Sequence, residues 1–248
     1  MKISVIVIVL NEEERIRACL ESVKWADEII VVDTGSSDGT VDICRRYTDK
    51  IYSSKWLGFG PLKNFAVSKT SNEWVLNIDA DERASDDLIN EILSLPLTPE
   101  VAAYSIAFHN FFMKRRLRFG GLGGERHTRL FNKNAACFGD QTVHEAVEVR
   151  GKTGKLKGHI EHRSYGDLEA YFKKFNIYTS LIAGEKFKKG KKFPLTAFFR
   201  IPYEFTMRYF FKLGFLDGVP GFVYASISAF YAGVKYFKLY ELEKGLKK

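Results

Sequence analysis

Apolar residues form short, nearly unbroken runs along the first hundred positions of the chain. The runs Ile3–Leu10, Glu28–Asp33 and Glu73–Asp79 lack the alternation of half-exposed strands, so they predict strands buried on both faces. A shorter strand is expected near Ile51, and Asn11 is expected to cap the first of several intervening helices. The predicted helices end near residues 24 and 47 and span 61–68 and 85–95. This alternation predicts βαβ units and a parallel sheet.

The pattern changes after residue 101. Three further strands are expected, some of them antiparallel: Ala102–Phe112, Arg126–Asn132 and Val143–Val149. A helix is expected at about Leu168–Lys186, and two or three aromatic-rich helices, broken near Gly214–Pro220, follow a basic connector. The predicted fold class is therefore α/β, with a mostly parallel central sheet flanked by helices. Its catalytic domain is expected to span residues 1–165, and a helical extension residues 166–248.

The net charge of the chain is unevenly distributed. The 248 residues carry a net charge of +8. Residues 186–248 alone carry +9 together with 17 of the 36 aromatic residues, whereas residues 1–185 carry −1. A basic, aromatic-rich segment is typical of proteins that bind an anionic surface, either nucleic acid or membrane.

The last quarter of the chain favours a membrane partner over nucleic acid. Residues 218–234 carry no charge, but 17 residues that include a proline are at the lower limit for a spanning helix. We therefore expect helices that lie in the membrane interface, with aromatic rings at headgroup level and lysines near anionic lipid. The expected location is the cytoplasm, at the inner face of the cytoplasmic membrane. The alternatives are a helical cap on the sheet or a homo-oligomer interface formed by the C-terminal helices.

The three cysteines, Cys19, Cys44 and Cys137, show no paired spacing. An odd number without a Cys-x-x-Cys pair argues against a disulfide framework and against a zinc site. A reducing, cytoplasmic compartment is the expected environment.

Polar residues follow three of the predicted parallel strands. Asn11 and Glu12 come after the first strand, Asp33 ends the second, and Asp79 ends the third. Ligands of open α/β sheets bind at the carboxyl ends of the strands. Any one of these residues alone could be a helix cap. Together they predict a nucleotide site, with Asp33 placed to bond a base or a ribose hydroxyl.

The segment Asp79-Ala80-Asp81-Glu82 places two carboxylates one residue apart, just after a buried strand. Such a pair can share a hard divalent cation, which would offset the charge of a diphosphate. The alternative interpretation is an acidic surface turn that opens the next helix.

Three segments, in this order and spacing, resemble family 2 glycosyltransferases of the GT-A fold: VIVLNEE within Val5–Glu13, VVDTGSSDGT at Val31–Thr40 and NIDADE at Asn77–Glu82. Later motifs resemble the subgroup that elongates bacterial lipopolysaccharide cores and related glycans. These motifs are Arg129-Leu130-Phe131, Val143-His144-Glu145, His162-Arg163-Ser164-Tyr165, Leu216-Asp217-Gly218 and Lys235-Tyr236. The resemblance implies an inverting transfer of a sugar, such as glucose, from a UDP-sugar to a glycan or lipid-linked acceptor.

The resemblance also implies roles for single residues. Asn11, Glu12 and Asp33 would contact the uridine, and Lys63 would lie near the nucleotide or its phosphates. Asp79 would approach the ribose or the metal, and Arg129, grouped with the donor-binding residues, would support the acceptor side. Asp81 would bind Mg²⁺ or Mn²⁺, with His162 completing the metal sphere or touching the diphosphate. Glu145 would be the catalytic base.

Inverting transfer needs a base for the acceptor hydroxyl and an electrophile for the leaving diphosphate. His144 and Asp140 compete with Glu145 as the base, and neighbouring residues of an extended strand point to opposite faces. Transfer also requires exclusion of water. The glycine- and arginine-rich segment Arg115–Arg126 is therefore a candidate lid over the donor, or else an ordinary surface loop.

Three other functions fit part of the sequence. A nucleotidyltransferase acting on sugar phosphates also combines an α/β sheet with metal-binding carboxylates, but its usual glycine-rich basic loop is absent after the first strand. The tetrapeptide Asp33-Thr34-Gly35-Ser36 matches aspartic proteases, which need two such loops in an all-β fold. A non-enzymatic membrane-binding protein would explain the basic tail but not the carboxylates.

Overall fold

The computed structural model describes residues 2–96, 100–139, 146–163 and 168–246. The chain forms two compact units. The first contains Met1–Phe108 and Arg126–His162, and the second contains His109–Glu125 and Arg163–Lys248. The second unit thus includes a segment from within the predicted α/β domain. The predicted boundary at residue 165 stays a prediction.

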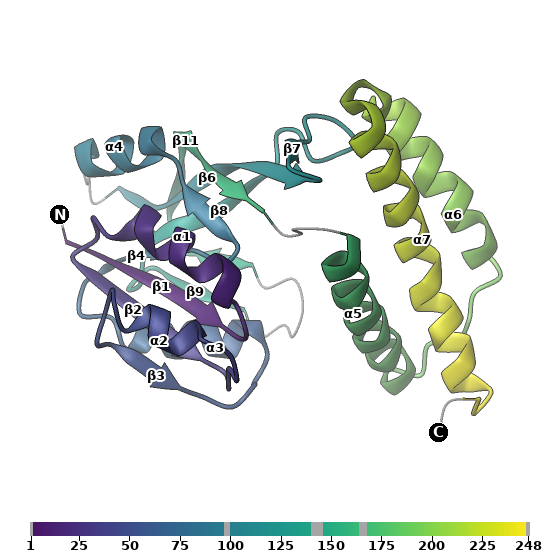
Figure 1. Ribbon diagram of the computed structural model, residues 1–248, viewed down its shortest axis with the longest axis horizontal. Helices are drawn as coiled ribbons and strands as arrows, with labels where there is room; N and C mark the ends of the chain where they lie inside the picture. The colour runs from purple at the N-terminus through teal and green to yellow at the C-terminus, as the bar shows by residue number, and fades with distance from the viewer. Residues whose placement is uncertain (1, 97–99, 140–145, 164–167, 247–248) are drawn as a thin grey trace. The chain divides into compact units, whose positions relative to one another are not determined.

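A mixed sheet is the centre of the first unit (Figure 1). Among the described residues its strand order is β3-β2-β1-β4-β8-β6-β11-β5. These strands are β1 (Ile3–Val9), β2 (Glu28–Asp33), β3 (Ile51–Ser53), β4 (Trp74–Asn77), β5 (Glu82–Ala84), β6 (Val101–Phe112), β8 (Arg126–Asn132) and β11 (Lys152–His162). Strands β3, β2, β1 and β4 run parallel, whereas β8 is antiparallel to β4 and β6, and β5 is antiparallel to β11. A separate antiparallel pair joins β9 (Ala136–Phe138) to β10 (Val147–Val149).

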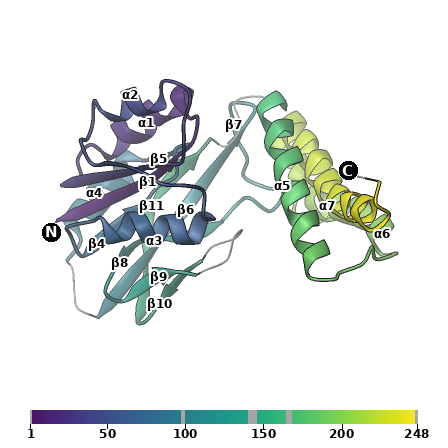
Figure 2. The same cartoon turned by 90° about the horizontal axis from the view of Figure 1, so that it is seen from below.

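Helices cover both faces of this sheet, as Figure 2 shows. Alternate residues of β1 belong to different apolar clusters: Val5 and Val7 pack with α1 (Glu13–Val23), α2 (Thr40–Cys44) and α4 (Asp86–Ser94). Ile6 packs on the opposite face with α3 (Phe59–Ser68). This double coverage is the reason why the strands are almost continuously apolar. The predicted buried strands and the predicted fold class are confirmed.

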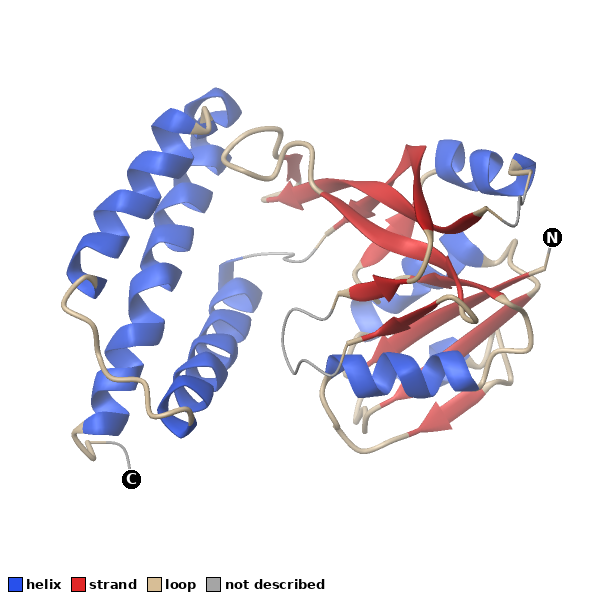
Figure 3. Cartoon of the chain, turned by 180° about the vertical axis from the view of Figure 1, so that it is seen from behind, coloured by secondary structure: helices blue, strands red, loops and turns tan. Residues whose placement is uncertain are grey.

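The second unit is mainly helical (Figure 3). It contains α5 (Leu168–Lys188), α6 (Ala197–Thr206) and α7 (Gly218–Glu243), with α5 and α6 each packed against α7. A π-helical turn, Met207–Phe211, and a 3-10 turn, Gly214–Asp217, connect α6 to α7, so the predicted break in the aromatic helices is confirmed. The short strand β7 (Arg115–Arg116) pairs with the end of β6. Taken singly, no described helix is both long and apolar enough to cross a bilayer; Ala197–Phe211 and Gly214–Glu243 meet the criteria only as a pair, bent by 71°.

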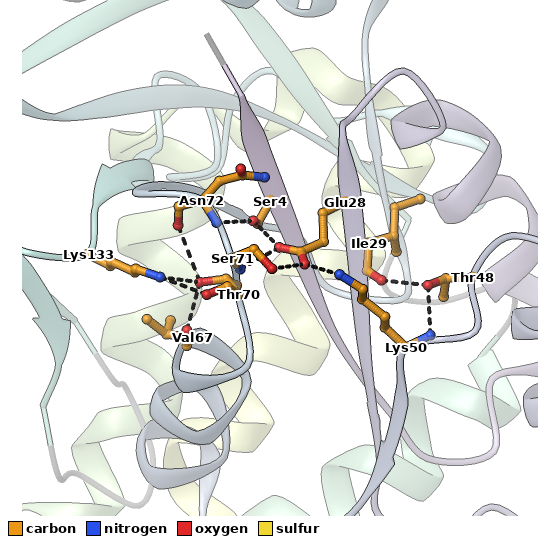
Figure 4. A network of polar contacts seen from close by, with 10 residues as sticks. All are labelled: Ser4, Glu28, Ile29, Thr48, Lys50, Val67, Thr70, Ser71, Asn72 and Lys133. Carbon is orange, nitrogen blue, oxygen red and sulfur yellow. Dashed lines mark hydrogen bonds and ion pairs between the residues drawn. The ribbon is translucent and has the colours of Figure 1, made fainter.

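Buried Glu28, at the start of β2, joins three strand ends through polar contacts (Figure 4). Its carboxylate accepts hydrogen bonds from the Ser4 hydroxyl and from Ser71 N and Oγ, the last two at 2.8 Å, and it pairs with Lys50. Burial alone would raise the pKa of Glu28, but Lys50 and the two serines outweigh it and lower the pKa to about 2. The ionised form of Glu28 therefore stabilises the folded chain.

Replacing Glu28 with glutamine should lower the free energy of unfolding at pH 7 by about 2 kcal/mol, allowing for the half-exposed Lys50. Because the folded pKa is depressed, this stabilisation is present above the ordinary pKa of 4.5 and is lost as the pH falls toward 2. Urea unfolding of both proteins between pH 7 and pH 3 measures the difference. Glu73→Gln, an exposed control, should change stability by less than about 0.5 kcal/mol. A Glu28→Gln difference that does not depend on pH would contradict the assignment.

Candidate active site

Asn11 shapes a loop at the carboxyl ends of β1 and β2. Its backbone N donates to Ser36 Oγ at 2.9 Å, and its side-chain Oδ1 accepts from Ser37 N at 2.8 Å. Asn11 has a φ of 53°, a left-handed conformation that asparagine tolerates better than most residues. The prediction that Asn11 caps α1 was wrong, because its amide bonds the neighbouring loop; the cap position belongs to Glu12.

The other two predicted uridine contacts lie at the same edge. Asp33 is 9% exposed, and its carboxylate accepts from Gly35 N at 3.2 Å and Ser36 N at 3.1 Å. Glu12 pairs with Arg15 at 2.8 Å. The parallel register places Val9 beside Asp33, which explains why the two loops meet. Asn11 and Asp33 therefore also stabilise the loops at the carboxyl edge of the sheet through these hydrogen bonds.

Sequence reasoning missed a second link between these loops. Glu13 Oε2 accepts from Gly39 N at 3.0 Å, while Glu13 N donates to Asp38 Oδ2 at 3.3 Å. Thr40 Oγ1 accepts from Glu12 N at 2.8 Å. The only signal in the sequence was the excess of acidic residues after the first strand. These bonds fix the start of α1 against the turn before α2.

Asp79 lies between two cations. Its Oδ1 is 3.2 Å from Lys63 Nζ, and its Oδ2 is 3.0 Å from Arg129 Nη2. Lys63 projects from α3 and is 3% exposed, while Arg129 comes from β8, the strand beside β4. Burial alone would raise the pKa of Asp79, but the charges of Arg129 and Lys63 outweigh it and hold the pKa well below its ordinary value. Asp79 is thus ionised, and its negative charge is balanced by Lys63 and Arg129.

Glu82 shares Arg129 with Asp79; the sequence placed it in the acidic segment but assigned it no role. Arg129 Nη2 lies 2.6 Å from Glu82 Oε1, and Asp79 N donates to Glu82 Oε2 at 2.9 Å. Burial raises the pKa of Glu82 above its ordinary value, against the opposing charge of Arg129. Glu82 therefore fixes both the Asp79 backbone and the Arg129 side chain.

The antiparallel pair β11 and β5 brings His162 to the acidic turn. His162 lies opposite Glu82 in the register, and its Nε2 is 3.6 Å from Asp81 Oδ1. Burial alone would lower the pKa of His162, but the contact with Asp81 and the charges of the other two carboxylates raise it above its ordinary value. The structure therefore places His162 and Asp81 together, as the sequence motifs indicated.

A divalent cation fits this pair only with help from a ligand. The described residues contain no group of three or more His, Cys, Asp or Glu side chains placed to hold a metal. Both Asp79 oxygens face cations, so Asp81 and His162 remain as the donors. Mg²⁺ is commonly held by one or two protein carboxylates together with phosphate oxygens. The residues therefore fit a metal that binds with a diphosphate.

The segment of the candidate base joins β9 to β10. Glu145, His144 and Asp140 lie outside the described residues. The end of β9 is held by Asn64 of α3, whose Nδ2 donates to Phe138 O at 2.9 Å and whose Oδ1 accepts from Phe138 N at 3.0 Å. Phe138, two residues before this segment, is thus bonded to α3 beside Lys63.

Comparison with known proteins identifies the family. Residues 4–148 match the model of glycosyl transferase family 2, which is more than half of the chain. The chain belongs to glycosyltransferase family 2. Membership confirms the resemblance in the sequence, and it favours sugar transfer over nucleotidyl transfer, peptide hydrolysis and a non-enzymatic role.

Relatives of this family 2 glycosyltransferase cover nearly its whole length. An uncharacterized glycosyltransferase of Rickettsia typhi is 35% identical over 97% of this chain and 87% of its own length. The lipopolysaccharide core biosynthesis glycosyltransferase LpsC of Rhizobium meliloti is 28% identical over 97% of this chain and 93% of its own.

Two solved structures are similar at a lower level. TarS of S. aureus, solved with UDP-GlcNAc, has a TM-score of 0.49 at 15% identity and covers 99% of this chain and 92% of its own. Glucosyl-3-phosphoglycerate synthase of Mycobacterium tuberculosis, solved with Mn²⁺ and UDP-glucose, has a TM-score of 0.37 at 23% identity and covers 43% of each chain.

Replacing Arg129 with methionine should lower the free energy of unfolding by about 3–5 kcal/mol, because Asp79 and Glu82 would lose their shared cation. Urea unfolding at pH 7 measures the loss. Arg45→Met removes an exposed pair with Asp42 and should cost less than about 1 kcal/mol. Equal losses in the two variants would show that Asp79 and Glu82 do not depend on Arg129.

Proposed function

We propose that this family 2 glycosyltransferase moves a hexose, such as glucose, from a UDP-sugar to a glycan acceptor with inversion at the anomeric carbon. One observation carries the proposal: Asp79 and Asp81 are held by Lys63, Arg129 and His162 at the carboxyl end of β4. The Asn11 and Asp33 loops lie at the carboxyl ends of β1 and β2, in the same parallel part of the sheet. Nucleotide ligands of such sheets bind at this edge.

The side chains divide the work of transfer between them. Asn11, Glu12 and Asp33 bind the uridine, and Lys63 and Arg129 keep Asp79 ionised beside the ribose. Asp81 and His162 would hold Mg²⁺ or Mn²⁺, which when bound would supply Lewis-acid stabilisation of the departing UDP. Glu145 takes the proton of the acceptor hydroxyl.

The acceptor in this proposal is a lipopolysaccharide core or a related lipid-linked or cell-surface glycan. The relative LpsC is named as a lipopolysaccharide core biosynthesis glycosyltransferase, and its match covers 97% of this chain. Such acceptors are membrane-embedded, and the basic, aromatic last quarter of the chain suits a location on the inner face of the cytoplasmic membrane.

A thermal-shift screen across UDP-, GDP- and dTDP-sugars, with and without Mn²⁺, tests the donor. A ligand that binds only the folded chain stabilises it by about 2.7 kcal/mol at a hundred times its Kd. We expect a UDP-hexose to raise the unfolding midpoint only when metal is present. Stabilisation by GDP- or dTDP-sugars alone would overturn the choice of nucleotide, and no binding of any UDP-sugar would overturn the donor site.

A further inference from the structure

The connection between α6 and α7 exposes a continuous group of apolar side chains. We name residues 207–222 the apolar bend. Within its part from residue 210 to residue 222, the only charged side chains are Lys212 and Asp217. Seven of its side chains are 43–73% exposed: Phe210, Phe211, Leu213, Phe215, Leu216, Val219 and Phe222. The four phenylalanines alone expose roughly 400 Å², which is the size of the largest apolar patch on a typical soluble monomer.

The apolar bend is packed through contacts between aromatic rings. The rings of Phe205 and Tyr209 stack at 5.3 Å between centroids, and Phe222 packs edge-on against them at 5.8 and 5.5 Å. Leu213 holds a φ of 57°, which a leucine adopts only where its surroundings enforce it. The exposed side chains are thus presented on a preformed surface.

A basic loop is fixed to this bend. We name residues 113–124 the basic loop. Asp217 accepts from Arg118 N at 3.1 Å and Phe119 N at 2.9 Å, and Lys212 O accepts from Gly120 N at 2.8 Å. These bonds join two segments that are 92–99 residues apart in sequence. The predicted lid segment is therefore held against the apolar bend within the second unit.

The charges beside the apolar side chains are positive. The basic loop exposes four bases and contains no acidic residue: Lys114, Arg115, Arg116 and Arg118. The Asp217 carboxylate is used by the loop backbone, and Glu204 pairs with Arg208 at 2.7 Å. The surface therefore combines exposed phenylalanines with arginines that form no ion pair with any described carboxylate.

We propose that the apolar bend and the basic loop form one docking surface for a bilayer that contains anionic lipids. Phenylalanine and leucine side chains enter the headgroup boundary, while the arginines meet lipid phosphates. The inference rests on the proposed membrane location and specifies its contact residues. A second copy of the chain would bury the apolar side chains, but it would bring two sets of positively charged arginines together, where they repel each other.

Cosedimentation of the full chain with vesicles of phosphatidylcholine, alone or mixed equally with phosphatidylglycerol, tests the surface. Phe210→Ser/Phe211→Ser should weaken binding to the mixed vesicles at least tenfold. Arg115→Gln/Arg116→Gln/Arg118→Gln should weaken it by about fivefold per arginine, and only when phosphatidylglycerol is present. Matched controls in the first unit are Leu93→Ser, at 62% exposure, and Lys152→Gln/Lys155→Gln/Lys157→Gln on β11; both should bind as the wild type does.

The outcomes separate this inference from the membrane location. Wild-type binding that neither test variant weakens would overturn the docking surface and leave the location standing. No binding by the wild type would overturn both, whereas UDP-sugar binding reports on the donor site independently. Sedimentation equilibrium completes the test: a dimer that Phe210→Ser/Phe211→Ser dissociates, without vesicle binding, would make the apolar bend a subunit interface.

Discussion

Replacing Asp81 with alanine is expected to abolish metal-dependent donor binding and to lower kcat/KM by about 10³-fold or more, since metal action contributes several kcal/mol to such reactions. Among the described residues, neither Asp79 nor Glu82 can replace Asp81. Both Asp79 oxygens are engaged by Lys63 and Arg129, and both Glu82 oxygens accept from Arg129 and the Asp79 backbone. His162 alone cannot hold the cation against the diphosphate.

Calorimetric titration of UDP, with Mn²⁺ and with a chelator, measures this loss. Wild-type affinity should fall when Mn²⁺ is removed, and Asp81→Ala should bind UDP weakly in both conditions. Asp87→Ala removes an exposed carboxylate in the first turn of α4 and should keep the metal dependence. Unchanged affinity of Asp81→Ala in the presence of Mn²⁺ would remove the metal role from this residue.

The first half of the fold could be predicted because its signals are local. Strands β1 and β2 are apolar at nearly every position, which only burial on both faces explains. Ser85 caps the start of α4: its side chain accepts from Leu88 N, the capping contact that short polar residues make. Local chemistry and tertiary position agree in this part of the chain.

Strand β11 was missed because tertiary packing defines it. Only two of its eleven residues, Leu156 and Ile160, are buried apolar side chains, and lysines and glycines occupy much of the rest. A side chain at Gly158 would come within 2.3 Å of Leu88 Cα, so this glycine permits close approach of β11 to α4. Neither the hydrophobic pattern nor the strand propensity of the segment reveals that contact.

The candidate site shows the same division. Asp79 and Asp81 could be found from their spacing after a buried strand. Their partners could not, because Lys63, Arg129 and His162 reach them from other elements and through sheet register. Family motifs indicated those three residues and grouped His162 with Asp81, but they did not indicate that Lys63 and Arg129 meet Asp79. The role of Glu82 was missed since nothing in the sequence distinguishes a buried carboxylate from an exposed one.

Glu145→Gln is expected to keep donor binding and to lower kcat by about 10²–10⁴-fold, the usual contribution of a general base. Glutamine has nearly the same shape as glutamate but cannot accept the acceptor proton. UDP affinity with Mn²⁺ should match the wild type, because the donor contacts proposed for Asn11, Asp33 and Asp81 do not involve this residue. Rates of sugar transfer and UDP affinity, measured on the same preparation, separate loss of the base from loss of binding.

A control for this substitution lies three residues further along the chain. Glu148 is exposed on β10, so Glu148→Gln makes the same chemical change without removing the proposed base and should retain full turnover. Retained turnover in Glu145→Gln would instead move the base to Asp140 or His144. The variants Asp140→Asn and His144→Gln then decide between these two, since only replacement of the true base abolishes transfer while UDP still binds.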